Sequence, residues 1–298
     1  MICSTLLYHS GMTTAATPRH VLITGASGFI ARHLTARLRA RGDVVTALAR
    51  GTLPDPHAHI DAVVNLAGAP ILGPPWTAAR RRLLRASRID STQRLVAALA
   101  ARTQRPAVLV SASAIGYYGV RGDEPLSEEA APQDIFQSQL VRDWETAALA
   151  AQGCGVRTVC LRLGVVLGRD GGALPQLALP VRLGLGAILG NGRQGAPWIH
   201  IDDVVRLIEF ALDQPTLSGA VNAVAPGHVD HATLQRTLAA VLHRPLWLRV
   251  PAFVLRTALG EMSQLLVDGQ HVVPARATAA GFVFEYPQLQ AALTQLLR

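Results

Sequence analysis

The chain contains no lysine: all 28 of its basic residues are arginine, and its net charge is +8. A basic total can indicate a nucleic-acid partner, but these arginines are spread along the sequence rather than gathered in one stripe. The densest group, residues 80–82 with Arg85 and Arg88, belongs to a predicted helix, where arginines usually face water. We therefore expect no nucleic-acid partner.

Cysteines and long apolar runs are also scarce. The three cysteines, Cys3, Cys154 and Cys160, have an odd number and a spacing that argue against a disulfide framework or a zinc site. Their scarcity fits a reducing compartment, so we expect a cytoplasmic protein with no metal. The most apolar stretch, 174–190, is broken by prolines and an arginine, whereas a membrane span needs about 20 apolar residues in a row. We therefore expect no membrane association.

The first residues of the chain carry little structural information. The apolar start lacks the basic segment of a signal peptide. We expect residues 1–18 to form a disordered leader, and Met12 is an alternative start of translation.

Strand and helix patterns alternate through the first half of the chain. Strands are predicted at 20–24, 44–49, 61–67, 108–112 and 157–163, and helices at 29–41, 77–102 and 133–151. This alternation predicts an α/β fold with a mostly parallel sheet and helices on both faces. The ten residues 51–60 are too few for a normal crossover unit, so that unit must be shortened or lost. Further helices are predicted at 202–212, 232–242 and 288–297.

A glycine-rich turn joins the first predicted strand to the first helix. It has the form Gly25-x-x-Gly28-x-x-Ala31. Gly25 permits a tight turn, and Gly28 lets the backbone approach a pyrophosphate at the positive end of the helix. In this strand–turn–helix context the motif predicts a Rossmann-type dinucleotide site.

The residue type at the end of the second predicted strand distinguishes NAD-binding from NADP-binding proteins. NAD-dependent proteins place a carboxylate there to bind the ribose hydroxyls, but this strand ends in Leu48-Ala49-Arg50. Arg50 can pair with a 2′-phosphate, which favours NADP(H). The alternative is an arginine that faces water.

Further motifs follow in a characteristic order. They are Asn65-Leu66-Ala67-Gly68, Ser87-Arg88, Ser111 to Gly119, Trp144-Glu145, Leu161 to Gly168, Gly171 to Pro175, Trp198 to Asp203, Asn222 to Pro226 and Leu266 to Gln270. From about residue 20 to its end, the chain resembles the atypical extended short-chain dehydrogenases/reductases called epimerase family proteins. These are similar to NAD-dependent epimerases and dehydratases and carry a C-terminal domain of unknown function.

The resemblance implies a domain organisation and a cofactor site. An NADP-binding Rossmann domain would span 19–168, with strand contributions from 195–225, and a smaller substrate-side lobe would span 169–298. The implied cofactor residues are Gly25, Ser27, Gly28, Phe29, Ile30, Arg50, Leu66, Ala67, Gly68, Arg88 and Val166. For Leu66, Ala67 and Val166, simple strand packing is the alternative. A homodimer through the helices at 77–102 and 133–151 is expected by analogy with relatives.

The resemblance also exposes a departure in the catalytic residues. Typical members of the superfamily use Ser, Tyr and Lys, with the lysine lowering the tyrosine pKa and the tyrosine transferring a proton during hydride transfer. Ser113 matches the serine. The expected Tyr and Lys positions hold Gln137 and Val141, which cannot transfer the proton. No other lysine exists to replace the missing one.

Two hypotheses follow for the function. In the first, the chain is an oxidoreductase or epimerase of unknown substrate, and Tyr117 or Tyr118 replaces the missing acid, although both rings have a structural alternative. In the second, the chain binds NADP(H) without turnover, as a regulator or redox sensor acting through a protein partner. Elsewhere, His200 is expected to be buried and hydrogen-bonded, Asp202 to cap the next helix, and Arg193 to face water or bind an anionic substrate.

Overall fold

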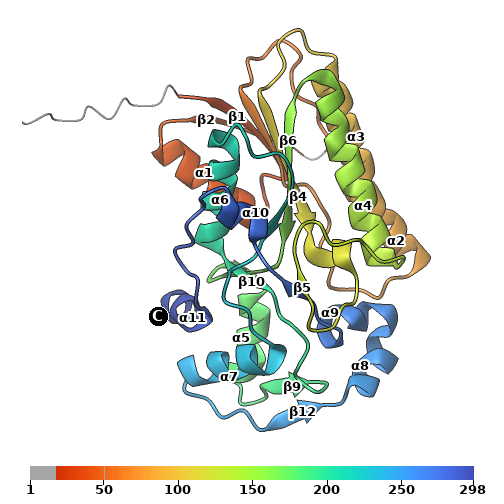
Figure 1. Ribbon diagram of the computed structural model, residues 1–298, viewed down its shortest axis with the longest axis vertical. Helices are drawn as coiled ribbons and strands as arrows, with labels where there is room; N and C mark the ends of the chain where they lie inside the picture. The colour runs from red at the N-terminus through yellow and green to blue at the C-terminus, as the bar shows by residue number, and fades with distance from the viewer. Residues whose placement is uncertain (1–17, 50) are drawn as a thin grey trace, which may run out of the picture.

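The main structural unit is a six-stranded parallel sheet with a smaller lobe below it (Figure 1). The computed structural model describes residues 18–49 and 51–298. The predicted leader up to residue 17 and the predicted phosphate ligand Arg50 lie outside the described residues.

The sheet has the strand order β11-β6-β4-β3-β1-β2. Its strands are β1 (His20–Thr24), β2 (Val44–Leu48), β3 (Ala62–Asn65), β4 (Val108–Ala114), β6 (Arg157–Leu163) and β11 (Gly219–Ala223). All are parallel, so their carboxyl ends meet at one edge, where open α/β sheets bind ligands. The predicted Rossmann-type sheet is confirmed, and residues 219–223 form its edge strand β11.

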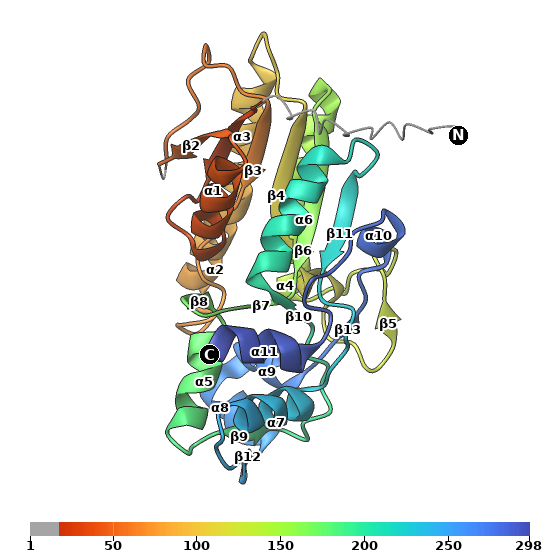
Figure 2. The same ribbon diagram turned by 90° about the vertical axis from the view of Figure 1, so that its left-hand side faces the viewer.

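Helices cover both faces of this sheet (Figure 2). On one face, α1 (Phe29–Ala40) and α6 (Ile201–Asp213) pack their apolar side chains into the largest core cluster. The other face carries α2 (Ala78–Arg85), the π turn η1 (Ala86–Asp90), α3 (Ser91–Ala100) and α4 (Phe136–Leu149). Thr77 caps α2 as predicted, because its side chain accepts a 3.2 Å hydrogen bond from the backbone N–H of Arg80.

The shortened crossover is also confirmed. The chain passes from β2 to β3 through residues 49–61, of which the described ones form no helix, and β3 pairs with β1 on the side away from β2. Near the carboxyl edge, the 3-10 turn η2 (Ile115–Tyr118) follows β4. At the opposite edge, the 3-10 turn η3 (Ala150–Cys154) connects α4 to the start of β6.

The C-terminal lobe is built from short elements. They are β7 (Val165–Gly168), β8 (Gly171–Gly172), α5 (Leu174–Arg182), β9 (Ala187–Leu189), β10 (Trp198–His200), α7 (His231–Val241), β12 (Leu248–Val250), α8 (Ala252–Leu259), η4 (Gly260–Ser263), α9 (Gln264–Val267), β13 (His271–Val272), α10 (Ala275–Ala279) and α11 (Leu289–Leu297). β13 pairs with β5 (Pro125–Leu126), which links the lobe to the loop after η2. Among the described residues, no helix has the length and apolar character needed to cross a membrane.

One predicted helix cap was wrong. The cap of α6 is His200, whose Nδ1 accepts a hydrogen bond from the Asp202 backbone N–H at 3.1 Å. Asp202 instead lies in the first helical turn, where its charge favours the helix dipole. His200 has no exposed surface and its Nε2 contacts Gln295 Oε1 at 3.1 Å, so the buried, hydrogen-bonded histidine is confirmed.

Candidate functional site

The glycine-rich turn fits closely against the loop that follows β3. Gly25 has φ +66°, and a Cβ there would lie 2.6 Å from the Leu66 carbonyl oxygen. Gly28 donates its backbone N–H to the Gly25 carbonyl at 2.8 Å and caps α1 without any side-chain hydrogen bond. The first turn of α1 therefore presents backbone N–H groups and the positive end of the helix dipole to a ligand.

Phe29 makes a packing contact that the glycine-rich motif alone did not predict. Its ring packs on the β7–β8 hairpin, where side chains at Gly168 or Gly171 would collide with it. The glycines of the hairpin thus let it pack closely against Phe29 at the start of α1. Ser27 and Gly28 are exposed in the turn, while Ile30 and Val166 are half-buried beside the core. The cofactor contacts predicted for these residues stay predictions.

Arg88 reaches the same edge from the helix side. Its guanidinium lies under the loop after β3, 3.4 Å from where a Cβ on Gly68 would be, and donates a 2.8 Å hydrogen bond to the Ala69 carbonyl. Among the described residues no carboxylate pairs with it. Burial, with a smaller contribution from Arg80, lowers the pKa of Arg88 to about 10. It therefore stays charged at neutral pH, a desolvated cation suited to an anionic ligand.

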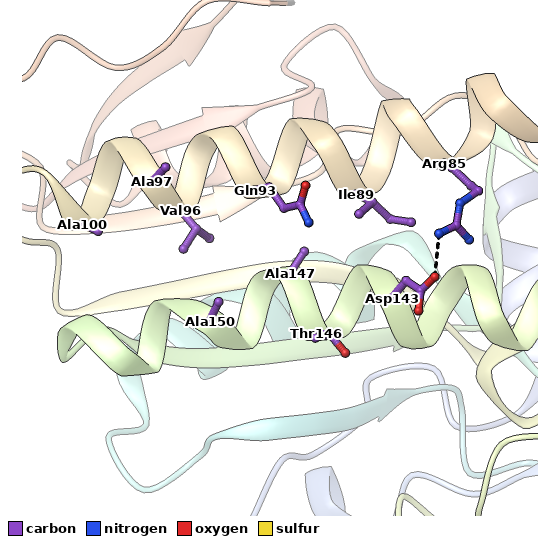
Figure 3. Close-up of a pocket in the computed structure, with 10 residues that line it drawn as sticks. All are labelled: Arg85, Ile89, Gln93, Val96, Ala97, Ala100, Asp143, Thr146, Ala147 and Ala150. Carbon is purple, nitrogen blue, oxygen red and sulfur yellow. Dashed lines mark hydrogen bonds and ion pairs between the residues drawn. The ribbon is translucent and has the colours of Figure 1, made fainter.

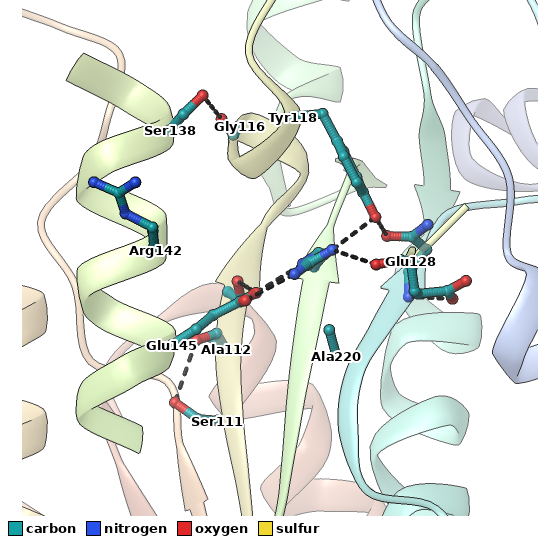
Figure 4. A network of polar contacts seen from close by, with 12 residues as sticks. Ser111, Ala112, Gly116, Tyr118, Glu128, Ser138, Arg142, Glu145 and Ala220 are labelled. Atoms are coloured by element: carbon teal, nitrogen blue, oxygen red, sulfur yellow. Dashed lines mark hydrogen bonds and ion pairs between the residues drawn. The ribbon is translucent and has the colours of Figure 1, made fainter. Parts of the chain in front are cut away.

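A closed polar network lies behind this edge (Figure 4). Ser113 at the end of β4 donates its hydroxyl hydrogen to Glu145 Oε1 at 2.5 Å. Arg162 on β6 holds the same carboxylate with two hydrogen bonds of 2.8 and 2.9 Å. Burial lowers the pKa of Arg162, but the hydrogen bonds and charge of Glu145 outweigh it and raise the pKa above its usual value.

The network continues through Tyr118 into the C-terminal lobe. The Tyr118 hydroxyl accepts from Arg162 at 2.9 Å and donates to Asn222 Oδ1 at 2.7 Å. Glu128 accepts the backbone N–H groups of Asn222 and of Arg276, at 2.9 and 3.2 Å. Tyr118 has no exposed surface, and burial raises its pKa despite the neighbouring arginine. The Tyr118 hydroxyl thus joins β6 to β11, and Glu128 joins β11 to α10.

The three predicted catalytic residues therefore differ in their surroundings. Ser113 is 2% exposed and Tyr118 is 0% exposed, and both hydroxyls are engaged within the network. Tyr117 is only half-buried, and its ring lies 3.5 Å from the Arg162 guanidinium carbon. Of the three, only Tyr117 is partly exposed.

Gln137 has a buried, unpaired side-chain oxygen that the sequence alone did not indicate. It lies on the same face of α4 as Val141 and Glu145, which follow at four-residue spacing, and packs against the backbone of Gly116. The side chain is 5% exposed, yet its Oε1 has no hydrogen-bond partner in the described part of the chain. An unpaired buried carbonyl is costly, so this amide is suited to receive a ligand donor.

A separate cavity is lined by none of these groups. It has a volume of about 520 Å³ and lies between the η1–α3 segment and α4 (Figure 3). Its lining is Arg85, Ile89, Gln93, Val96, Ala97, Ala100, Asp143, Thr146, Ala147 and Ala150. The Arg85–Asp143 ion pair of 2.7 Å bridges the two helices at one end. These are the helices of the predicted homodimer, which stays a prediction.

The fold is that of an extended short-chain dehydrogenase/reductase. The family model "NAD dependent epimerase/dehydratase family" matches residues 21–224, and the model "Domain of unknown function (DUF1731)" matches residues 250–296. The chain belongs to the NAD-dependent epimerase/dehydratase family.

Relatives and solved structures agree with this assignment. Epimerase family protein YfhF of Bacillus subtilis (strain 168) is 37% identical over 93% of this chain and 98% of its own length. Epimerase family protein SDR39U1 of Bos taurus is 39% identical over 93% of this chain and 99% of its own. The crystal structure of human epimerase family protein SDR39U1 with NADPH has a TM-score of 0.87 and 35% identity, covering 93% of this chain and 98% of that one.

Proposed function

We propose that this chain is an NADP(H)-dependent oxidoreductase or epimerase that acts on a small molecule bearing a carbonyl or hydroxyl group. The observation that carries cofactor binding is the meeting of three features at one edge of the sheet. They are the Gly25–Gly28 turn, the α1 N-terminus without a side-chain cap, and the unpaired cation of Arg88. A pyrophosphate satisfies the backbone donors and the arginine together. The NADPH in the human relative's structure supports the same cofactor here.

The chemistry proposed for this site assigns one task to each available residue. The nicotinamide, when bound, supplies or accepts the hydride. Tyr117 gives or takes the proton at its phenolic oxygen, and its ring is held in place against the Arg162 guanidinium. Gln137 orients the substrate oxygen through its carboxamide. Ser113 acts as a positioning residue, because its hydroxyl is held by Glu145.

Hydride transfer from 4-deuterated NADPH to a panel of small carbonyl compounds tests this proposal. We expect deuterium to appear in a product, and Tyr117→Phe to lower the rate by about 100-fold, the usual value of a general acid. NADPH affinity should not change in this variant. Tyr286→Phe is the matched control, since Tyr286 stacks on His200 in the C-terminal half and should leave the rate unchanged.

The same experiment distinguishes an enzyme from a non-catalytic NADP(H)-binding regulator. Tight NADPH binding without deuterium transfer to any carbonyl would contradict the oxidoreductase proposal. It would instead favour a non-catalytic NADP(H)-binding regulator. The observation behind that alternative is the internal engagement of Ser113 and Tyr118, together with the lack of lysine.

A further inference from the structure

A second cavity, of about 510 Å³, lies in the C-terminal lobe. Its walls come from the loop after β9, the first turns of α7, and β12, which sit at the end of the lobe away from β1 and β2 (Figures 1 and 2). The lining residues are Asn191, Gly192, Arg193, Asp230, Ala232, Arg236 and Arg249. The volume is in the range of small-molecule sites.

Three arginines from separate segments line this cavity. Arg193 comes from the loop, Arg236 from α7 and Arg249 from β12. Within residues 18–49 and 51–298, none of the three forms an ion pair with a carboxylate. Other arginines of this sheet-and-lobe structure pair with acids, as Arg37 does with Glu209 and Arg256 with Asp268. All three side chains are exposed, so their positive charges are accessible to an anion from solvent.

The one carboxylate of the cavity is already engaged. Asp230 caps α7 by accepting a 2.7 Å hydrogen bond from the Thr233 backbone N–H. Burial alone would raise the pKa of Asp230, but the hydrogen bonds to Thr233 and the charge of Arg236 hold it below its usual value. Asp230 therefore cancels one of the three positive charges, and two remain in excess.

The backbone around the cavity is held in place by contacts of its own. The Ala232 N–H donates to the Gly192 carbonyl at 2.9 Å, and Gly190 N–H donates to the Val250 carbonyl at 2.8 Å. Gly192 has φ +79°, and a Cβ there would lie 2.7 Å from Ile188 and 2.8 Å from Ala232. The loop is thus packed onto β9 and α7, so the backbone that carries Arg193 is held in place without a ligand.

We infer that this cavity binds the phosphoryl group of a small phosphorylated molecule, at a site separate from the cofactor site. A phosphoryl group carries about two negative charges at neutral pH and offers three acceptor oxygens, which matches the excess charge and the donors. Arginine binds such groups with paired N–H donors. The Asn191 carboxamide, whose Oδ1 accepts the Arg193 backbone N–H at 2.9 Å, still has its N–H donors to offer.

Calorimetric titration with inorganic phosphate and pyrophosphate tests this inference, with sodium chloride at equal ionic strength as the reference. We expect saturable binding of at least one of the two, and at least a tenfold weaker affinity in the double variant Arg236→Gln, Arg249→Gln. Arg244→Gln is the matched control, because Arg244 is exposed nearby but does not line the cavity.

Two results would overturn the inference. One is equal phosphate binding by the wild type, the control and the double variant, which would mean non-specific attraction to a basic protein. The other is a loss of NADPH affinity in the double variant with NADH affinity unchanged, which would mean that these arginines bind the cofactor's 2′-phosphate. Unchanged NADPH affinity with lost phosphate binding would support a separate site and would not depend on the proposed oxidoreductase activity.

Discussion

Two buried arginines show how the closed network differs from the carboxyl edge of the sheet. Arg162 is held by both oxygens of Glu145, and its pKa is raised. Arg88 is also largely buried but has no carboxylate partner among the described residues, and its pKa is lowered to about 10. The first pair is complete within the protein, whereas the second cation lacks its counter-charge. The difference separates a charged group whose interactions are complete within the protein from one that lacks a counter-charge.

The same contrast holds for tyrosines and amides. The Tyr118 hydroxyl and the Asn222 carboxamide are fully hydrogen-bonded to each other and to their neighbours. Tyr117 is half-buried, and the Gln137 Oε1 has no partner in the described structure. Substitutions in the network should therefore cost stability, and substitutions at the edge should cost ligand binding.

The largest effect is expected from Glu145→Gln. This change leaves the buried Arg162 without a counter-ion, which typically costs about 3–5 kcal/mol of unfolding free energy. Chemical denaturation measures it, and Glu129→Gln, at an exposed position, is the control. A loss below about 1 kcal/mol would show that the network is not the structural anchor described above.

A smaller loss of stability is expected from Tyr118→Phe. The change removes a hydroxyl that joins Arg162 to Asn222, so both groups keep their burial but lose one partner. We expect about 1–3 kcal/mol less unfolding free energy with NADPH affinity unchanged. If stability stayed the same while hydride transfer stopped, Tyr118 rather than Tyr117 would be the acid.

The opposite sign is expected for Gln137→Met. Replacing the unpaired buried amide with an apolar side chain of similar size should raise the unfolding free energy by up to about 1 kcal/mol. Any hydride transfer detected with the wild type should become slower. Thermal melting measures the stability, and Gln139→Met, at a half-buried position on the same helix, is the control. A clear destabilisation would indicate that Gln137 has a structural partner.

Local patterns predicted much of the fold because they depend on neighbouring residues. The strands His20–Thr24 and Arg157–Leu163 have their predicted ends, and the missing helix between β2 and β3 followed from loop length. The choice of His200 over Asp202 as helix cap depended on the path of β10 into α6, which local sequence does not fix.

The site was less predictable because its meaning depends on distant partners. Ser113 matched a catalytic serine in sequence, but its hydrogen bond to Glu145 spans 32 positions along the chain. The sequence shows only that Gln137 stands where the tyrosine is expected. That its amide is unpaired can be recognised only when all its neighbours are known. Arg50 lies outside the described residues, so its role at the 2′-phosphate stays a prediction.

The most direct test of this comparison is the stabilisation of the protein by NADPH in the wild type and in Arg88→Met. At a concentration 100 times Kd, a ligand that binds only the folded state raises the unfolding free energy by about 2.7 kcal/mol. We predict that the wild type gains this amount, while Arg88→Met keeps its stability without ligand but loses at least about 1.4 kcal/mol of the gain, a tenfold weaker affinity. An equal gain in both proteins would contradict the claim that the unpaired arginine at the carboxyl edge awaits the cofactor.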